Sequence, residues 1–577
     1  MDENSSGSLV VLGCSATKFE VKGTVPAVHL YDGPMYRVLR SFLRSYRWPT
    51  KLSLGILSAK YGLIGSMALV RHYDQRMTSE RASKLKENVT STLKELSVGH
   101  QNVHLVLGKD YREAIDDSVL RQNARVSYAD GPIGMKLHSF SQLLQCQPRM
   151  ARTVCAPEAL SRPLYFLPDW DDFLDVNYDF KTDQFSAASR SEREEVHMIK
   201  LFQPQRLCDG VLVSLAQHLG TKGLLRRVPI DDPYLLKPRS VREHFGLATD
   251  QWAFGDCGAF SYVNEDKPSI TIEQAVAVYD LYEFDLGASV DHIPIEEIVT
   301  KKGKRKLSID ERKSRVRLTK RNAEAFISLC RARGAGFIPV GVIQGLDAAS
   351  FGRQILEYIE MGYTHIALGG LVPRQDAEID EIVREVSSKI SALKDRPWIH
   401  LLGVFRPKLQ DKFRALNVNS FDSATYFRKA WLRSDQNYLG ADGHWYAALR
   451  VPPTSDPRTL VRLKKSKLSE DEIKRRERAV IQSLHQYSNR RTSLKKCLAA
   501  IVDYDQLLDR ASSEHGNIEQ QYARTLKERP WEKCPCKVCS AIGINAVIFR
   551  GYNRNKRRGA HNTFHLYGFL GRNSEID

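Results

Sequence analysis

The segment FIPVGVIQG at residues 337–345 is followed by DAASFGRQILEYIEMG at 347–362 and then by HIALGGLV at 365–372. The first and third segments are apolar runs of the length of a buried strand, and the middle one has its apolar residues at helical spacing. A further helical pattern at 380–395 precedes the apolar run WIHLLGVF at 398–405. Strands separated by single helices favour a parallel sheet covered by helices.

The same alternation begins earlier in the chain. A helical pattern at 271–282 precedes the strand-like YEFDLGASVDHIP, and another at 315–334 precedes residue 337. The unit recurs about every 30 residues, which suits a (β/α)8 barrel of the TIM type over residues 160–450. A doubly wound open sheet has the same local pattern, so periodicity alone leaves both α/β architectures open.

Residues 1–150 show a separate alternation, and we predict that they form a small N-terminal α/β domain. Its three strand-like runs are at 8–15, 51–63 and 102–111. Lys18 and Lys60 follow the first two runs, at the edge where open parallel sheets bind ligands. These stretches resemble YaaA-like domains, which implies a phosphate or nucleic-acid contact. Tight turns with solvent-facing lysines are the alternative.

The charge balance points to a polyanionic partner. The chain has 86 Lys and Arg residues against 68 Asp and Glu residues, a formal net charge of +18. Nucleic acid is the polyanion that such a surplus most often serves, although a solvated basic surface is the alternative. The basic residues are bunched at 301–306, 462–467, 474–478 and 554–558.

No apolar run reaches the roughly 18 residues of a membrane span, and the first residues, MDENSSGSLV, are acidic and polar. We therefore expect a cytoplasmic protein without a membrane partner. Ten cysteines are too few for a disulfide scaffold of this length.

The C-terminal part, residues 455–577, is predicted to be a separate basic and helical subdomain. The prolines of RVPPTSDP at 450–457 indicate a linker before it. Ser469 and Glu472 have capping-box spacing at the start of a helical pattern. Near the end, WEKCPCKVCS places Cys534, Cys536 and Cys539 within six positions.

Polar residues and glycines follow the predicted barrel strands, where barrel enzymes have their active sites. They are Asp256, Asp285, Asp291, Gln344, Gly369, Gly370 and Asp422. Any one carboxylate might only cap the next helix, but the whole set converging on one mouth favours an active site.

In chain order the motifs are DCGAF, FDLG, VIQG, LGGLV and SFDS, followed by C-x-C-x-x-C and a downstream histidine. This series resembles the tRNA-guanine transglycosylases, which are zinc-containing (β/α)8 barrels. The resemblance covers roughly residues 160–577 and leaves the N-terminal domain outside it.

The resemblance implies a structural zinc ion held by Cys534, Cys536, Cys539 and His561, with His565 as the competitor for the fourth position. Three thiolates and one imidazole are ligands for a closed tetrahedral zinc site, which stabilises a subdomain and leaves no position for a catalytic water.

The resemblance also implies roles at the barrel mouth. Asp422 is the expected nucleophile that attacks C1′ of the nucleoside, and Asp256 is the expected general acid and base. The base-binding residues implied by the resemblance are Asp285, Gln344, Gly369, Gly370 and Cys257. Asp291 is a further substrate-binding candidate, although Asp291-His292 has no obvious counterpart among the tRNA enzymes. Arg428 is expected to contact the nucleic acid.

Two departures from the tRNA enzymes concern the substrate. Cys257 stands where those enzymes usually have serine, and the loop after Asp422 reads SATYFRKAW instead of a proline-containing, arginine-rich sequence. These departures point to a subgroup. The segment FDLGASVDHIP, the RRGAHNTFHLY ending and the extra N-terminal domain are similar to the DpdA-type paralogues, which place 7-deazaguanine bases in DNA.

That similarity implies exchange of guanine in DNA for 7-cyano-7-deazaguanine through a covalent aspartyl-C1′ intermediate. The expected partners are DNA, the incoming base and an ATPase of a DNA-modification system, and the sequence leaves a homodimer open. A tRNA-guanine transglycosylase and a non-catalytic, zinc-containing nucleic-acid-binding subunit are the alternatives.

Overall fold

The computed structural model describes residues 7–570 except for several short segments. Those segments are 22–23, 121–123, 148–161, 170–171, 190–191, 219–235, 238–239, 301–302, 433–434, 457–458, 460, 462–467 and 509–514. The predicted basic run at 462–467 and the predicted boundary between residues 150 and 160 lie outside the described residues. The chain forms two compact units: the first contains residues 1–159, 212–244 and 252–401, and the second the rest.

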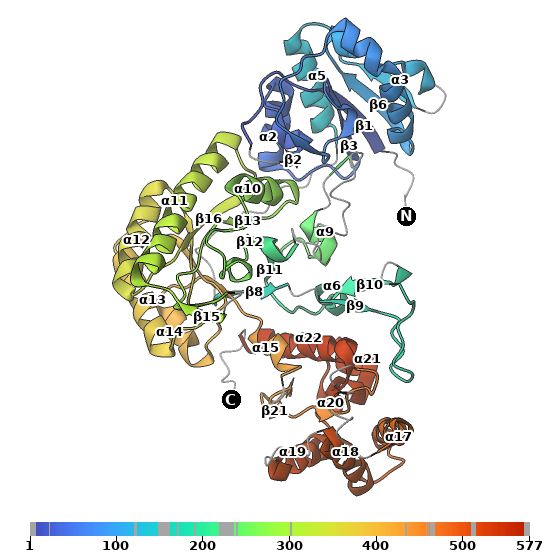
Figure 1. The fold of residues 1–577 in the computed structure, drawn as a ribbon, viewed down its shortest axis with the longest axis vertical. Helices are drawn as coiled ribbons and strands as arrows, with labels where there is room; N and C mark the ends of the chain where they lie inside the picture. The colour runs from blue at the N-terminus through green and yellow to red at the C-terminus, as the bar shows by residue number, and fades with distance from the viewer. Residues whose placement is uncertain are drawn as a thin grey trace. The chain divides into compact units, whose positions relative to one another are not determined.

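The N-terminal residues form a five-stranded sheet with the order β4-β3-β1-β6-β7 (Figure 1). The strands are β1 (Gly7–Gly13), β3 (Leu52–Ser58), β4 (Gly62–Gly65), β6 (His100–Val106) and β7 (Arg125–Tyr128). Strand β1 pairs in parallel with β3 and β6. Helix α3 (Ser79–Leu96) buries Val89 and Leu93 against Leu9 and Val11 of β1. The predicted N-terminal α/β fold is therefore present.

Eight strands close into a barrel, which decides between the two architectures that the sequence left open. In barrel order they are β11 (Gly210–Ser214), β12 (Trp252–Asp256), β13 (Leu286–Ala288), β16 (Ile338–Ile343), β17 (His365–Leu368), β18 (Trp398–Leu401), β19 (Ser420–Asp422) and β8 (Leu164–Pro168). Neighbouring barrel strands such as β13 and β16, and β16 and β17, pair in parallel, with Leu286 opposite Ile338 and Val340 opposite His365. The carboxyl ends of parallel strands lie at one mouth of such a barrel.

Helices follow the barrel strands along the chain (Figure 1). The main ones are α10 (Ile272–Leu281), α11 (Ile309–Arg333), α12 (Ala348–Met361) and α13 (Asp376–Ile390). Capping boxes at Ser308 and Asp347 begin α11 and α12, and Gly334 and Gly362 end these helices in the left-handed conformation. These local signals explain why strand and helix alternate at a regular spacing.

The C-terminal residues form a helical subdomain with α17 (Glu470–Ser488), α18 (Leu494–Leu508), α19 (His515–Glu528), α20 (Pro530–Lys533), α21 (Lys537–Ile542) and α22 (Gly551–Leu570). As predicted, Ser469 caps a helix: its hydroxyl accepts the Glu472 N–H of α17. Helix α22 contains two fully buried arginines, Arg554 and Arg558. Among the described residues, no helix is both long and apolar enough to cross a membrane.

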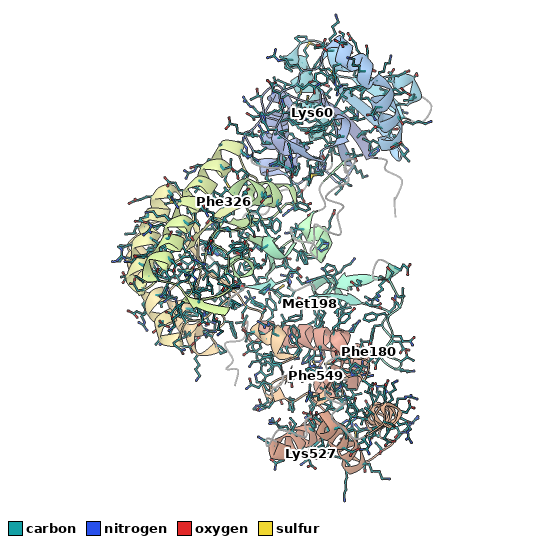
Figure 2. All side chains as sticks on the ribbon, viewed as in Figure 1. Lys60, Phe180, Met198, Phe326, Lys527 and Phe549 are labelled. Carbon is teal, nitrogen blue, oxygen red and sulfur yellow. The ribbon has the colours of Figure 1, made fainter. Side chains whose placement is uncertain are left out.

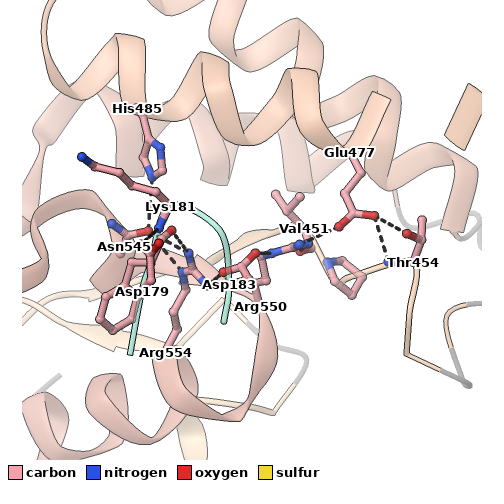
Figure 3. A network of polar contacts seen from close by, with 12 residues as sticks. Asp179, Lys181, Asp183, Val451, Thr454, Glu477, His485, Asn545, Arg550 and Arg554 are labelled. Carbon is pink, nitrogen blue, oxygen red and sulfur yellow. Dashed lines mark hydrogen bonds and ion pairs between the residues drawn. The ribbon is translucent and has the colours of Figure 1, made fainter. Parts of the chain in front are cut away.

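An ion-pair network connects α22 with the loop between strands β9 (Phe173–Asp175) and β10 (Glu195–His197) (Figure 3). The Asp183 carboxylate pairs with both Arg550 and Arg554. Arg550 also pairs with Glu477 of α17, at 2.6 Å. This charge compensation allows the guanidinium of Arg554 to be buried in the subdomain.

Candidate active site and metal centre

The carboxyl ends of the barrel strands carry most of the predicted residues. Asp256 ends β12, Gln344 follows β16, Gly369 and Gly370 follow β17, and Asp422 ends β19. Ser214, which sequence reasoning missed, ends β11. The signal for it was present, because GVLVS at 210–214 is an apolar run that ends in a polar residue.

Gln344 is the centre of a buried polar group. Its side-chain amide donates a 2.6 Å hydrogen bond to the Asp291 carboxylate, and its backbone oxygen accepts one from Gln354. A Cβ atom at Gly369 would lie 2.3 Å from Gln344 Nε2, and one at Gly370 would lie 2.5 Å from Oε1. Gly370 also has a φ of +67°. Both glycines are therefore required for the position of the Gln344 amide.

Buried polar atoms without a hydrogen-bond partner mark this edge. Among the described residues at this edge, these atoms are Asp291 Oδ1, Gln344 Oε1 and Ser214 Oγ. Buried polar atoms are nearly always hydrogen-bonded, so such a group indicates a polar ligand that completes it. Burial raises the pKa of Asp291 to about 6, because a carboxylate loses hydration there.

Asp256 and its neighbour Cys257 have different surroundings. The half-buried Asp256 carboxylate accepts the Gly258 N–H at 2.8 Å, and Gly258 is in the left-handed conformation. The Cys257 thiol is fully buried and lies 3.4 Å from the Tyr279 hydroxyl. The thiol also lies 3.5 Å from the Ala288 carbonyl oxygen, and its predicted contact with the base stays a prediction. Its burial raises the pKa of the thiol.

Asp422 is buried at the end of β19, where it lies in register with Phe166 of β8. One of its carboxylate oxygens, Oδ1, accepts the Gly403 N–H at 2.7 Å. This bond fixes the orientation of the carboxylate. Arg428 is exposed on the following helix, α15 (Thr425–Lys429).

The prediction for Asp285 is wrong. Strand β13 begins at Leu286, so Asp285 lies at its amino end, opposite to the mouth. Its carboxylate accepts hydrogen bonds from Arg47 at 2.8 Å and Arg242 at 3.0 Å, and from the Ala253 N–H. The sequence FDLGASVD contains two aspartates, and the structure brings the second one, Asp291, to Gln344.

The cysteine cluster has the geometry of a metal centre. The thiolate positions of Cys534, Cys536 and Cys539 lie 3.5, 3.3 and 3.4 Å from His561 Nδ1. Zinc bonds of about 2.3 Å to sulfur and 2.0–2.1 Å to nitrogen, arranged tetrahedrally, require separations close to these. The four buried residues form a group that could hold a metal ion.

Surrounding contacts favour His561 over His565 as the fourth ligand. His561 Nε2 lies 2.7 Å from the Leu439 carbonyl oxygen, which fixes the proton on Nε2 and leaves Nδ1 for the metal. The Tyr438 ring stacks on His561 at 3.9 Å between centroids. His565 reaches Cys534 alone, at 3.1 Å from its sulfur. The cluster thus contains the predicted histidine.

Comparison with known proteins adds to this geometry. The chain is 32% identical over 412 residues to a protein of Salmonella montevideo described as "DNA-guanine transglycosylase". The aligned region covers 71% of this chain and 97% of that protein. The chain belongs to the DNA-guanine transglycosylase family.

The N-terminal domain has a separate relationship. Residues 9–142 match the model of a family of unknown function, DUF6884. Lys60, which is labelled in Figure 2, follows strand β3 of the N-terminal domain. The ammonium groups of Lys18 and Lys60 lie 4.6 and 5.7 Å from the centroid of the Tyr73 ring. The predicted phosphate or nucleic-acid contact of these lysines stays a prediction.

Proposed function

We propose that this protein exchanges guanine in DNA for 7-cyano-7-deazaguanine, through a covalent bond between an aspartate and C1′ of the deoxyribose. The observation that carries the proposal is the group formed by Asp291, Gln344, Gly369 and Gly370, which presents unpartnered buried polar atoms at the carboxyl edge of the barrel. Membership of the DNA-guanine transglycosylase family supports the same activity.

The base-binding step uses the complementary edges of guanine and of its 7-deaza analogue. The Asp291 carboxylate accepts hydrogen bonds from the ring N1–H and the exocyclic amine. The Gln344 amide and the Gly370 backbone bind the carbonyl edge. Both bases share this edge, so one pocket accepts the leaving base and the incoming base. The target nucleotide must leave the DNA stack, at a cost of a few kcal/mol.

The exchange then needs two displacements at C1′. An oxygen of Asp422 attacks C1′, the bond from C1′ to guanine N9 breaks, and Asp256 gives its proton to the departing base. Asp256 next removes the proton from N9 of the incoming base. That nitrogen attacks C1′ and releases Asp422, so the configuration at C1′ is retained. The Cys534, Cys536, Cys539 and His561 group holds zinc as a structural ion, outside these steps.

The test is mass spectrometry of nucleosides from DNA and from tRNA, each incubated with the protein and 7-cyano-7-deazaguanine. Host cell extract is added to supply the proposed ATPase partner. We expect the deazaguanine nucleoside in DNA only, and at least a thousandfold less of it with Asp422→Ala, because the nucleophile is then absent.

A second readout follows the protein itself. Denaturing electrophoresis with labelled DNA should show a covalent complex with the wild type and none with Asp422→Ala. Full exchange by Asp422→Ala would contradict the assignment of the nucleophile. Deazaguanine in tRNA instead of DNA would contradict the proposed substrate.

A further inference from the structure

A second buried group of metal-binding side chains lies outside the sites described above. Asp169 follows strand β8, Asp172 precedes strand β9, and His197 ends strand β10. All three are buried, with at most 4% of the residue exposed. Strands β9 and β10 pair so that Phe173 faces His197, which brings Asp172 and His197 to the same end of the hairpin. Met198, the next residue, is labelled in Figure 2.

The distance between His197 and Asp169 in this group is typical of two ligands of one metal ion and is too long for a hydrogen bond. His197 Nε2 lies 3.6 Å from Asp169 Oδ1, which is beyond hydrogen-bonding distance. Nε2 is buried and has no hydrogen-bond partner among the described residues. One potential ligand atom from each residue lies within 4.8 Å of the others. Two ligands bound tetrahedrally at about 2.0–2.2 Å from a metal are separated by about 3.4 Å.

We propose that Asp169, Asp172 and His197 bind a divalent first-row transition metal ion, at a site separate from the cysteine cluster. One imidazole and two carboxylates suit Zn²⁺ or Mn²⁺, whereas the three thiolates of the cysteine cluster favour Zn²⁺ over Mn²⁺. Three protein ligands leave at least one coordination position for water or an oxygen of another ligand.

Binding requires one proton to move within His197. Its Nδ1 accepts the Ile199 N–H at 3.3 Å, so the neutral ring carries its proton on Nε2. When the metal takes the Nε2 lone pair, the proton transfers to Nδ1 through solvent and the Ile199 contact is lost. That contact is long, but its loss leaves the buried Ile199 N–H without this acceptor, at a cost of about 1–3 kcal/mol that the metal–ligand bonds have to exceed.

The site would fix the segment between barrel strands β8 and β11. The loop between β9 and β10 is held by Asp183, which pairs with Arg550 and Arg554 (Figure 3). At the other end of the hairpin, the proposed ion connects Asp172 and His197 to Asp169, which follows the carboxyl end of β8. Strand β8 pairs with β19, where Phe166 is in register with Asp422. The ion would therefore stabilise the strand next to the nucleophile.

The first experiment counts metal ions in the full-length protein. After dialysis against Zn²⁺, elemental analysis should give two equivalents of zinc. After dialysis against Mn²⁺, it should give one equivalent of zinc and one of manganese. Asp172→Asn should bind the second ion at least tenfold more weakly, because a carboxylate ligand becomes an amide. Asp179→Asn, in an exposed turn of the same segment, should bind it as the wild type does. One equivalent in all proteins, or a second equivalent unchanged in Asp172→Asn, would overturn the proposal.

A measurement on the wild type avoids the risk that a variant does not fold. In the Mn²⁺-loaded protein labelled with ¹⁵N-histidine, pulsed electron paramagnetic resonance should detect one directly bound histidine nitrogen. Its absence would overturn the proposed ligand set, and neither experiment depends on the exchange activity.

Discussion

At the scale of single residues, two aspartates six positions apart have opposite surroundings. Asp285 is held by the guanidinium groups of Arg47 and Arg242 at the amino end of β13. The Asp291 carboxylate, beyond the carboxyl end of the same strand, accepts a hydrogen bond from the neutral amide of Gln344. The first carboxylate is neutralised by two guanidinium groups, whereas the second faces an uncharged amide.

We predict that binding of the incoming base depends on the ionisation of Asp291. With a pKa of about 6, the carboxyl group is neutral at pH 5 and charged at pH 8. Only the charged form accepts both hydrogen bonds from the base. The KM for 7-cyano-7-deazaguanine should therefore fall as the pH rises through about 6, and Asp291→Asn should remove that dependence.

Thermal unfolding gives an independent check of the same pKa. The folded pKa of about 6 is raised above the ordinary value of 3.8, so the stability that Asp291 contributes is present at pH 3 and is lost between about pH 4 and pH 6. The full difference is about 3 kcal/mol, at 1.36 kcal/mol for each pH unit. Relative to the wild type, Asp291→Asn should gain stability over this interval. A constant difference would contradict the raised pKa.

For Asp285 we predict a structural effect. Asp285→Asn leaves two buried guanidinium groups without their carboxylate and should lower the free energy of unfolding by about 3 kcal/mol. Denaturant unfolding measures this change. At a temperature where the variant is folded, its KM for the base should equal that of the wild type. A large rise in KM without loss of stability would return Asp285 to the base-binding site.

At the scale of elements, helices α21 and α22 position side chains of the cysteine cluster. Cys536 caps α21, where its sulfur accepts the Cys539 N–H at 3.4 Å. Helix α22 supplies His561, and Tyr438 of β20 (Tyr438–Leu439) covers the imidazole. The candidate ligands thus come from two segments, residues 534–539 and helix α22, which a bound ion would hold together.

We predict that Cys536→Ser releases one equivalent of zinc and destabilises the C-terminal subdomain by several kcal/mol, because structural zinc sites supply folding free energy. Elemental analysis and thermal unfolding measure both effects. Cys497→Ser is the matched control, since Cys497 is also a buried thiol but lies in α18, outside the cluster. Equal zinc content in the two variants would contradict the assignment.

At the scale of the whole molecule, the formal charge of +18 is the surplus of basic over acidic residues, and ion pairs within the chain leave it unchanged. Within the described residues, basic side chains such as Lys84 and Lys304 pair with neighbouring carboxylates at the surface. Exposed pairs of this kind contribute little to stability, and the net charge remains available to a polyanion.

We predict that DNA binding weakens steeply with salt, because lysines and arginines displace counterions from the phosphates. With about six phosphate contacts, affinity should fall about a thousandfold between 50 and 200 mM salt. Fluorescence anisotropy with labelled DNA measures the slope. Arg428→Gln should reduce that slope by about one if Arg428 contacts a phosphate, and an unchanged slope would exclude that contact.

The helix predicted at 315–334 begins earlier, at Ile309. Local pattern in the sequence was sufficient for the α/β class, for the helices that begin after Asp347 and Ser469, and for the three clustered cysteines. Each of these depends on residues that are close in the chain, such as a capping pair or C-x-C-x-x-C. The closure of the barrel depends on pairing between distant strands, β8 and β19, and no local pattern encodes it. The same reason explains the assignment of Asp285. Both aspartates of FDLGASVD are consistent with a strand end, and only the position of β13 relative to Arg47 and Gln344 decided which carboxylate pairs with a guanidinium group and which contacts the Gln344 amide.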